Sequence, residues 1–479
     1  MQARHWRGFV PAVLAAVSLA ASGQAPDRAQ RRGPGSSSTL TPLIVKRQLS
    51  NGLPVWLVEQ HELPVVQISL QVLTGSDADP PGKYGIASLT AAMLAEGAGS
   101  RSAVDIADVL DTLLANLSAS SGGDASSVQL HVPVEKLAEA LPLMADVSQR
   151  PTFPTSQLER VRQRRLVTLL NGRDDPDTVA AQAFARGIYG PSHRSAAAQI
   201  GSVDGLERLT PQDLKAFHAS AYRPDNSTLI VVGDVSSDEV LPLLETHFGR
   251  WQPASVNGVA PEPAPALQQP PRQLLLIDAP SAPQSRILVG GLGPSNAMSD
   301  FFPIQVLNSV LTSRLNSGRS QTLRDYTAGV RSGFEVGKSA KPFIVATAAQ
   351  ANQTAQSLRE LLNELTGVGT EVSADEIARA KDGIAFQFST TFEAAGRISN
   401  RLRALESLVV NRLPDDYYST YVPAVQAVSA ADVRRVAQQY IQPDHLVIVI
   451  VGDRKVIEAP IRALSVGPVQ VVNIEDVVR

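Results

Sequence analysis

Three strands are predicted in the first part of the chain from runs of apolar and β-branched residues. Apolar and polar positions alternate within Val65–Leu73, and shorter apolar runs occupy Val55–Val58 and Ser127–Val132. Apolar residues recur at helical spacing in four further stretches, namely Ile86–Glu96, Ala103–Ala115, Val134–Ser148 and Thr155–Leu170. Strands and helices do not alternate strictly, so the pattern favours an α+β fold over a doubly wound sheet.

One set of three signals occurs twice along the chain. A helix start, a Pro-Asp turn and an apolar strand ending in Gly-Asp occupy Leu209–Leu214, Tyr222–Asn226 and Leu229–Asp234. The signals return 219 residues later, at Val428–Val433, Ile441–His445 and Ile448–Asp453. A Thr or Ser, a residue type that caps helix N-termini, precedes each helix. Chance similarity rarely keeps three signals in register, so the chain consists of two homologous halves.

A proline-rich stretch separates the two halves. Residues 252–272 contain six prolines, and proline cannot donate the backbone hydrogen bonds that a sheet requires. We therefore predict a first domain at residues 45–251, a linker at 252–272 and a second domain at 273–470.

The composition indicates a globular protein without a strong field of either sign. The chain has 479 residues, of which 43% are hydrophobic and 19% charged, and its formal net charge is −3. These values exclude a disordered chain and a strongly basic nucleic-acid binder, and leave proteins or peptides as the expected partners. The chain has no cysteine, so it carries neither a disulfide nor a lipoprotein anchor.

The N-terminus has the pattern of a secretory signal. Arg4 and Arg7 precede an apolar run, Phe9–Ala21, which is followed by small residues. A run of about 13 residues is shorter than the roughly 20 that span a bilayer, so a cleaved signal is favoured over a membrane anchor. We predict a signal peptide at residues 1–23 and a flexible lead-in at 24–44. The mature protein is then expected to be exported, to a bacterial periplasm, without a membrane span.

Several short motifs, in order and at similar spacing, resemble the pitrilysin and mitochondrial-processing-peptidase family. They are Leu49–Leu53, Gly85–Met93, Tyr222–Asn226 and the pair Gly233-Asp234, and the resemblance extends over residues 45–460. It implies that each half is an α+β roll domain. It also implies that the two rolls form half of a clamshell, which a second chain completes.

The family's zinc motif is degenerate in this chain. The family helix reads Gly-Leu-Ala-His-x-x-Glu-His-Met, whose histidines bind zinc and whose glutamate is the general base. Ser88, Ala91 and Ala92 occupy those three places, and neither alanine offers a lone pair to a metal. The family's third ligand is a glutamate on a later helix, and residues 160–173 contain no acid. We therefore predict no catalytic residue and no zinc in this chain, and expect zinc in a partner subunit.

Four arginines lie within that later helix. Arg160, Arg162, Arg164 and Arg165 could line a chamber for acidic substrates, but charges spread around a helix favour a solvated surface.

A loop in the second half resembles the family's substrate-binding segment. In the family an arginine and a tyrosine seven residues later hold the peptide backbone, and Arg319 and Tyr326 keep that spacing. Aligning Leu323-Arg324 with the family's Leu-Arg makes Arg324 the alternative and leaves Ala328 opposite a second family tyrosine. Guanidinium and phenol groups suit a role in binding a carbonyl or oxyanion. A solvated loop with incidental charges remains the other interpretation.

These features lead to one principal hypothesis and two competing ones. The chain is expected to be an exported, non-catalytic subunit that pairs with a homologous zinc peptidase and helps bind its peptide substrate. The alternative is a scaffold or interaction protein of the same fold with no peptidase role. A weakly active enzyme with an unrecognised site is the third hypothesis, and the missing ligands weigh against it.

Overall fold

The structure is a computed structural model that describes residues 44–252, 267–294, 299–316, 323, 327–335, 337–393 and 398–478. The predicted signal peptide and nearly all of the lead-in lie outside these residues. Most of the predicted linker, residues 253–266, also lies outside them. Within the described ranges, no helix is long and apolar enough to cross a membrane.

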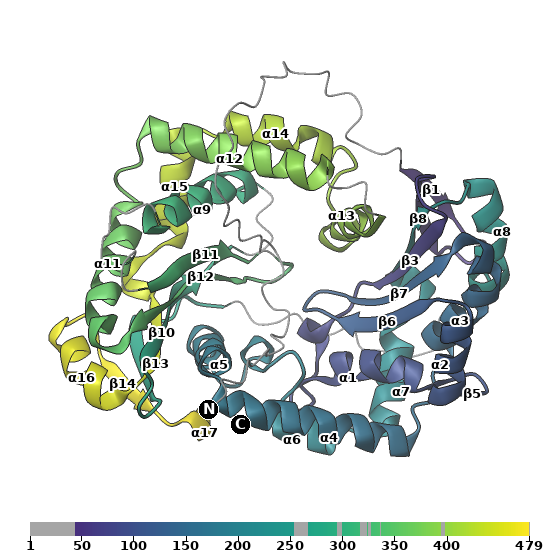
Figure 1. Cartoon of the computed structure of the whole chain (residues 1–479), viewed down its shortest axis with the longest axis horizontal. Helices are drawn as coiled ribbons and strands as arrows, with labels where there is room; N and C mark the ends of the chain where they lie inside the picture. The colour runs from purple at the N-terminus through teal and green to yellow at the C-terminus, as the bar shows by residue number, and fades with distance from the viewer. Residues whose placement is uncertain are drawn as a thin grey trace, which may run out of the picture. The chain divides into compact units, whose positions relative to one another are not determined.

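A six-stranded mixed sheet forms the centre of the first half (Figure 1). Its strands are β1 Val45–Gln48, β2 Pro54–Glu59, β3 Val65–Val72, β6 Asn116–Ser121, β7 Ser126–Pro133 and β8 Ser227–Gly233. Their order is β1-β2-β8-β3-β7-β6, in which only β2 and β8 run parallel. A separate two-stranded ribbon pairs β4, Gly97–Ala98, with β5, Arg101–Ser102.

The second half contains a second six-stranded sheet. Its strands are β9 Gln273–Asp278, β10 Gln284–Leu292, β11 Thr327–Phe334, β12 Pro342–Gln350, β13 Val447–Gly452 and β14 Val469–Val472. From one edge to the other the order is β14-β9-β13-β10-β12-β11. The five strands β9-β13-β10-β12-β11 correspond in order to β2-β8-β3-β7-β6. In both sets the first pair is parallel and the other three pairs are antiparallel. The predicted duplication is therefore confirmed, and the sheets differ only in the edge strand that precedes this set.

The helices of the first half follow the predicted stretches closely. The predicted helices at Ile86–Glu96 and Val134–Ser148 each include a 3₁₀ turn at one end, and the other two agree within a few residues. The helices are α1 Ile86–Met93, α2 Ala103–Thr112, α3 Leu137–Gln149, α4 Thr155–Asn171, α5 Pro176–Tyr189, α6 Val203–Arg208, α7 Pro211–Ala221 and α8 Ser237–Phe248.

The helices of the second half include a copy of α7 with the same cap. Thr210 and Asp213 form a capping box at α7, and Ser429 and Asp432 form one at α15. The helices are α9 Phe301–Asn316, α11 Thr354–Gly367, α12 Ala374–Glu393, α13 Ile398–Asn411, α14 Tyr417–Ala427, α15 Ala430–Tyr440, α16 Arg454–Ala463 and α17 Ile474–Val478.

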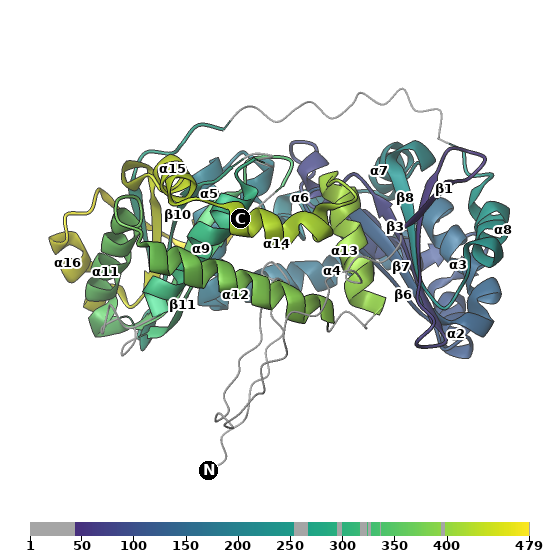
Figure 2. The same ribbon diagram turned by 90° about the horizontal axis from the view of Figure 1, so that it is seen from above.

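Each sheet has a helix from its own half on one face and a helix from the other half on the opposite face. Helices α3 and α8 cover one face of the first sheet, and α13 packs on the other (Figure 1 and Figure 2). In the second sheet, α11 and α16 contribute to the main core, whereas α5 packs on β10 and β13. The two halves thus exchange α5 and α13.

The α13 contact with the first sheet also has a polar part. One carboxylate oxygen of Glu406 accepts hydrogen bonds from Ser69 at 2.7 Å, Gln71 at 2.7 Å and Gln129 at 2.8 Å. Ser69 and Gln71 are buried, so Glu406 supplies an acceptor for polar groups that lie away from the surface.

The last residues of the predicted linker are bound to the second half. The side-chain amide of Gln269 donates to the Leu292 carbonyl at 3.0 Å, and the Pro270 carbonyl lies 2.9 Å from Nδ1 of His445. The Arg272 amide donates to the Asp444 carbonyl at 2.9 Å. The described end of this stretch therefore belongs structurally to the second domain.

Because α5 and α13 are exchanged, we expect a cut between the halves to leave them associated. A specific protease site inserted between residues 253 and 266 should allow cleavage into two fragments that still elute together in native size-exclusion chromatography. Phe184→Asp places a charge in the buried face of α5 and should let the cut fragments separate. Separate elution of the cut fragments without this substitution would contradict the expectation.

Candidate functional site

Asp79 holds the start of α1, the helix that corresponds to the family's zinc helix. Its two carboxylate oxygens accept backbone N–H groups of Gly85 at 2.6 Å and Ala87 at 3.1 Å. Burial raises the pKa of Asp79 to about 7, although the two hydrogen bonds favour the charged form. The carboxylate therefore satisfies the free N–H groups that every helix start leaves, and it does so in a buried place.

The entry to α1 also depends on a close approach between two backbones. Gly85 has φ of 95°, and a Cβ at this position would lie 2.5 Å from the Cα of Gly201. Only glycine fits this conformation and this distance. The start of α1 is therefore fixed against the turn that ends at Gly201.

The three degenerate positions lie on α1 as predicted. Ser88 and Ala92 are half-buried and stand four residues apart, on one side of the helix, whereas Ala91 is buried. Among the described residues, no three His, Cys, Asp or Glu side chains are grouped so that they could hold a metal ion.

A guanidinium group from α4 reaches this helix. Arg165 donates to the Ser88 carbonyl at 2.7 Å and to the Ile200 carbonyl at 3.2 Å. Burial lowers the pKa of Arg165 to about 10, and the nearby Asp79 carboxylate opposes this shift. The group still carries a positive charge at neutral pH, and this charge would repel a zinc ion at α1.

The interpretation of the α4 arginines as a solvated surface is wrong for two of them. Arg162 is 7% exposed and donates to the Leu206 and Leu209 carbonyls, and Arg165 bonds to α1. Arg160 pairs with Glu96 at the surface, and Arg164 is exposed. The buried pair follows the apolar face of α4, because α4 buries Leu158, Val161 and Leu169 at helical spacing.

Sequence reasoning missed Asp79 and Arg165. The apolar periodicity of α4 was a usable signal for Arg165, since position 165 continues the stripe of Val161 and Leu169. Asp79 had a weaker signal, because six residues separate it from the helix that it caps. Local cap patterns place the capping residue directly before the helix.

The predicted substrate-binding residues Arg319, Arg324 and Tyr326 lie outside the described residues. The elements on both sides of them are well fixed. Asn316, at the end of α9, exchanges hydrogen bonds with the backbone of Val330 on β11 at 2.7 and 2.9 Å. Asn316 therefore ties the end of α9 to strand β11.

A buried ion pair anchors α9 before this segment. The guanidinium of Arg314 pairs with Glu376 at 2.8 Å, and it lowers the pKa of Glu376 to about 2.

Comparison with known proteins identifies the family. Residues 55–181 match the family profile described as insulinase (peptidase family M16), and residues 208–384 match the profile described as peptidase M16 inactive domain. The chain belongs to peptidase family M16, as the sequence motifs predicted. The first profile lies within the first half, and the second begins at residue 208, near the end of the first half, and continues into the second half.

Individual relatives agree with this assignment. A Mycobacterium leprae protein named uncharacterized zinc protease is 26% identical over 297 residues, which cover 59% of this chain and 63% of the relative. The chain thus spans about three fifths of the length of the first curated relatives that it matches.

Solved structures share the fold. The structure described as peptidase M16 inactive domain from Pseudomonas fluorescens has a TM-score of 0.76 and 24% identity, covering 86% of this chain and 98% of that one. The periplasmic protease PqqL from Escherichia coli has a TM-score of 0.71 and 18% identity, covering 88% of this chain and 49% of that one.

The isolated chain is expected to retain no stoichiometric zinc after a chelator wash. Restoring Ser88→His, Ala91→Glu and Ala92→His should still give no tight site, because a third ligand is missing and Arg165 bonds to the same helix. Adding Thr168→Glu together with Arg165→Gln should raise bound zinc toward one equivalent, measured by elemental analysis.

Thr168 is chosen over its neighbour Leu169 because Thr168 is exposed and Leu169 lies in the core. The matched control replaces the exposed Arg164 by Gln in place of Arg165, and should leave the zinc content low. One equivalent of zinc in the unmodified chain, with chelator-sensitive peptide cleavage, would overturn the prediction.

The raised pKa of Asp79 predicts a particular dependence of stability on pH. The folded state holds a proton on Asp79 that the unfolded state has lost above its ordinary pKa of 3.8, so this group's contribution decreases as pH rises from about 4 to about 7. The unfolding free energy of the wild type minus that of Asp79→Asn should decrease by roughly 2–4 kcal/mol over this range. Denaturant unfolding at several pH values measures it.

Asp105 provides a control of opposite sign. Hydrogen bonds from Ser102 lower the pKa of Asp105 in the folded state. The contribution of Asp105 to folding stability is therefore lost only when the pH falls below the ordinary pKa of an aspartate. The unfolding free energy of the wild type minus that of Asp105→Asn should therefore not decrease as the pH rises from 4.5 to 7. A pH-independent difference for Asp79→Asn would contradict the prediction.

Proposed function

We propose that this chain is a non-catalytic M16 subunit that pairs with a homologous, zinc-bearing peptidase chain and helps bind the peptide substrate. The proposal rests on the residues that α1 carries at the positions of the family's zinc motif. Its ligand positions hold Ser88 and Ala92, its base position holds Ala91, and the group that reaches it from α4 is the cation Arg165. If a protein with this scaffold and without these ligands takes part in peptide cleavage, another chain supplies the zinc chemistry.

The relative lengths of similar proteins support a partner chain. This chain aligns with about half of the Escherichia coli protease, so that protein has room for a second unit of this size in one polypeptide. We propose that the second unit is here a separate chain.

Two features support a role in binding peptide. Strand β6 forms one edge of the first sheet and packs against α1, so its outer row of backbone groups lies near the zinc helix. An extended peptide can add to such an edge by backbone hydrogen bonds. The segment between α9 and β11 supplies Arg319, Arg324 and Tyr326 as candidates to bind a carbonyl group.

We propose that the protein acts outside the cytoplasm, in a bacterial periplasm. The support is the signal-like pattern at residues 1–23 and the periplasmic protease among proteins of this fold. Co-purification from the exported fraction, with zinc analysis, would identify the partner.

If the chain contributes binding groups to a partner's active site, Arg319→Ala and Tyr326→Phe should each lower the peptidase rate of the complex and leave its assembly intact. Loss of one hydrogen bond to a reacting carbonyl costs on the order of 1–4 kcal/mol, which is roughly 10- to 1,000-fold in rate. Steady-state kinetics of the co-purified complex measures the effect.

Arg324→Ala separates the two alignments of the loop, since only one of Arg319 and Arg324 is expected to matter. Arg359→Ala, an exposed arginine on α11, is the matched control and should change nothing. If none of Arg319→Ala, Tyr326→Phe and Arg324→Ala changes the peptidase rate of a zinc-containing complex, the chain acts as a scaffold and not as a substrate-binding subunit.

A further inference from the structure

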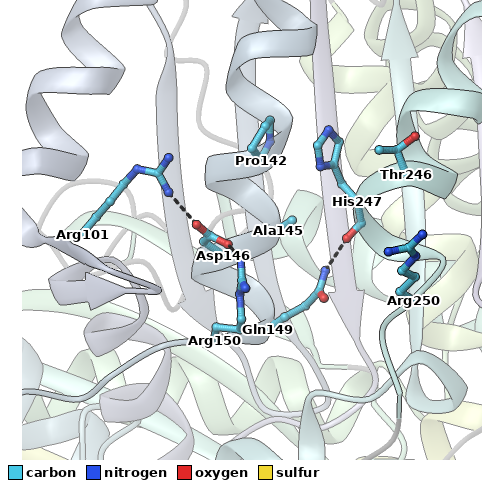
Figure 3. Close-up of a pocket in the computed structure, with 9 residues that line it drawn as sticks. All are labelled: Arg101, Pro142, Ala145, Asp146, Gln149, Arg150, Thr246, His247 and Arg250. Carbon is cyan, nitrogen blue, oxygen red and sulfur yellow. Dashed lines mark hydrogen bonds and ion pairs between the residues drawn. The ribbon is translucent and has the colours of Figure 1, made fainter.

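We propose that a basic pocket in the first domain binds a small oxyanion of the phosphate type. The pocket has a volume of about 440 Å³ and lies between the ends of α3 and α8 and the strand β5 (Figure 3). This volume is within the range of small-molecule sites. Its charged lining residues are Arg101, Asp146, Arg150 and Arg250.

A single buried carboxylate orients two of the arginines. Asp146, whose side chain is 9% exposed, pairs with Arg101 at 2.5 Å through one oxygen and with Arg150 through the other. The side chains of Arg101 and Arg150 remain 37% and 70% exposed. Each guanidinium has five N–H groups, so both retain donors for a ligand after pairing with Asp146.

The backbone at Gly99 lies close to the Asp146 carboxylate. Gly99 has φ of 58°, and a Cβ at this position would lie 3.0 Å from a carboxylate oxygen of Asp146. The turn at Gly99 therefore approaches the carboxylate more closely than a side chain would easily allow. Asp146 acts as a positioning residue for Arg101 and Arg150.

The third arginine and a histidine come from α8 and the residues after it. Within the described parts of the chain, no hydrogen bond or ion pair involves the guanidinium of Arg250 or the ring of His247. Three arginines thus line the pocket, with Arg250 on the side opposite Arg101 (Figure 3), together with one carboxylate that is already paired. The excess is positive, and most free polar groups are donors, so a suitable ligand supplies negative oxygen acceptors.

Stabilisation of helix ends accounts in part for Arg150, the C-cap residue of α3, but not for Arg101. Helices α3 and α8 both end at the pocket, and cations stabilise helix C-termini. However, Asn51 already binds the Phe248 and Trp251 carbonyls, and Gln149 binds the His247 carbonyl at 3.0 Å. Arg101 lies before the N-terminus of α2, where a cation has no such role.

The test uses the intact mature chain and pyrophosphate as the probe, by isothermal titration calorimetry at low and moderate salt. We expect saturable binding that weakens as salt increases. Arg250→Ala should weaken it about 10-fold or more without loss of folded stability, because this guanidinium has no partner within the described structure. Arg150→Ala should have a similar effect on binding.

Asp146→Asn tests the positioning role of Asp146. The substitution keeps the shape of the side chain but removes the charge that pairs with Arg101 and Arg150. It should weaken pyrophosphate binding although it removes a negative charge, which a purely electrostatic attraction would not do. Arg359→Ala on α11 is the control and should bind as the wild type does. Absence of pyrophosphate binding, or binding indifferent to Arg150→Ala and Arg250→Ala, overturns the proposal. Equal affinity for citrate overturns the assignment to phosphate chemistry.

Discussion

Both faces of each central sheet must be covered, and each sheet obtains part of this cover from the other half of the chain. Every residue of β8 and of β13 is buried, so neither strand has a face that water could occupy. Helix α13 covers Ile230 and Val232 on β8, and α5 covers Val447 and Val449 on β13. Since each half supplies a helix that covers the other half's sheet, the two repeats form one compact unit in spite of their duplication.

Polar contacts made by the chain itself hold α1 in its place. By the family resemblance, zinc would join α1 to a later helix through side-chain ligands. Here Arg165 joins α4 to α1 through the Ser88 carbonyl, and Asp79 holds the first turn of α1 through backbone N–H groups. Both contacts use backbone groups of α1, so they are compatible with small, chemically inert side chains at Ser88, Ala91 and Ala92.

Local patterns in the sequence predict the elements but not how the halves combine. Periodicity identified α1 to α4 because each has an apolar stripe, and the repeated signals identified β8 and β13 because the copies keep register. The exchange of α5 and α13 could not be predicted in this way. An apolar helix face shows that a partner exists, but it does not say which sheet that partner is. Likewise, no local pattern predicts the hydrogen bond from Arg165 to the Ser88 carbonyl, because this contact depends on tertiary packing.

Polar contacts decide how α13 sits on its sheet. Apolar contacts such as those of Leu402 and Leu405 stabilise the helix without strongly fixing its direction, because the hydrophobic effect is not directional. Glu406 adds direction, since one of its oxygens must meet donors from both β3 and β7. A shifted helix would leave Ser69 and Gln71 buried without this acceptor. The apolar residues thus supply most of the stabilisation, and the carboxylate selects one arrangement of the two repeats.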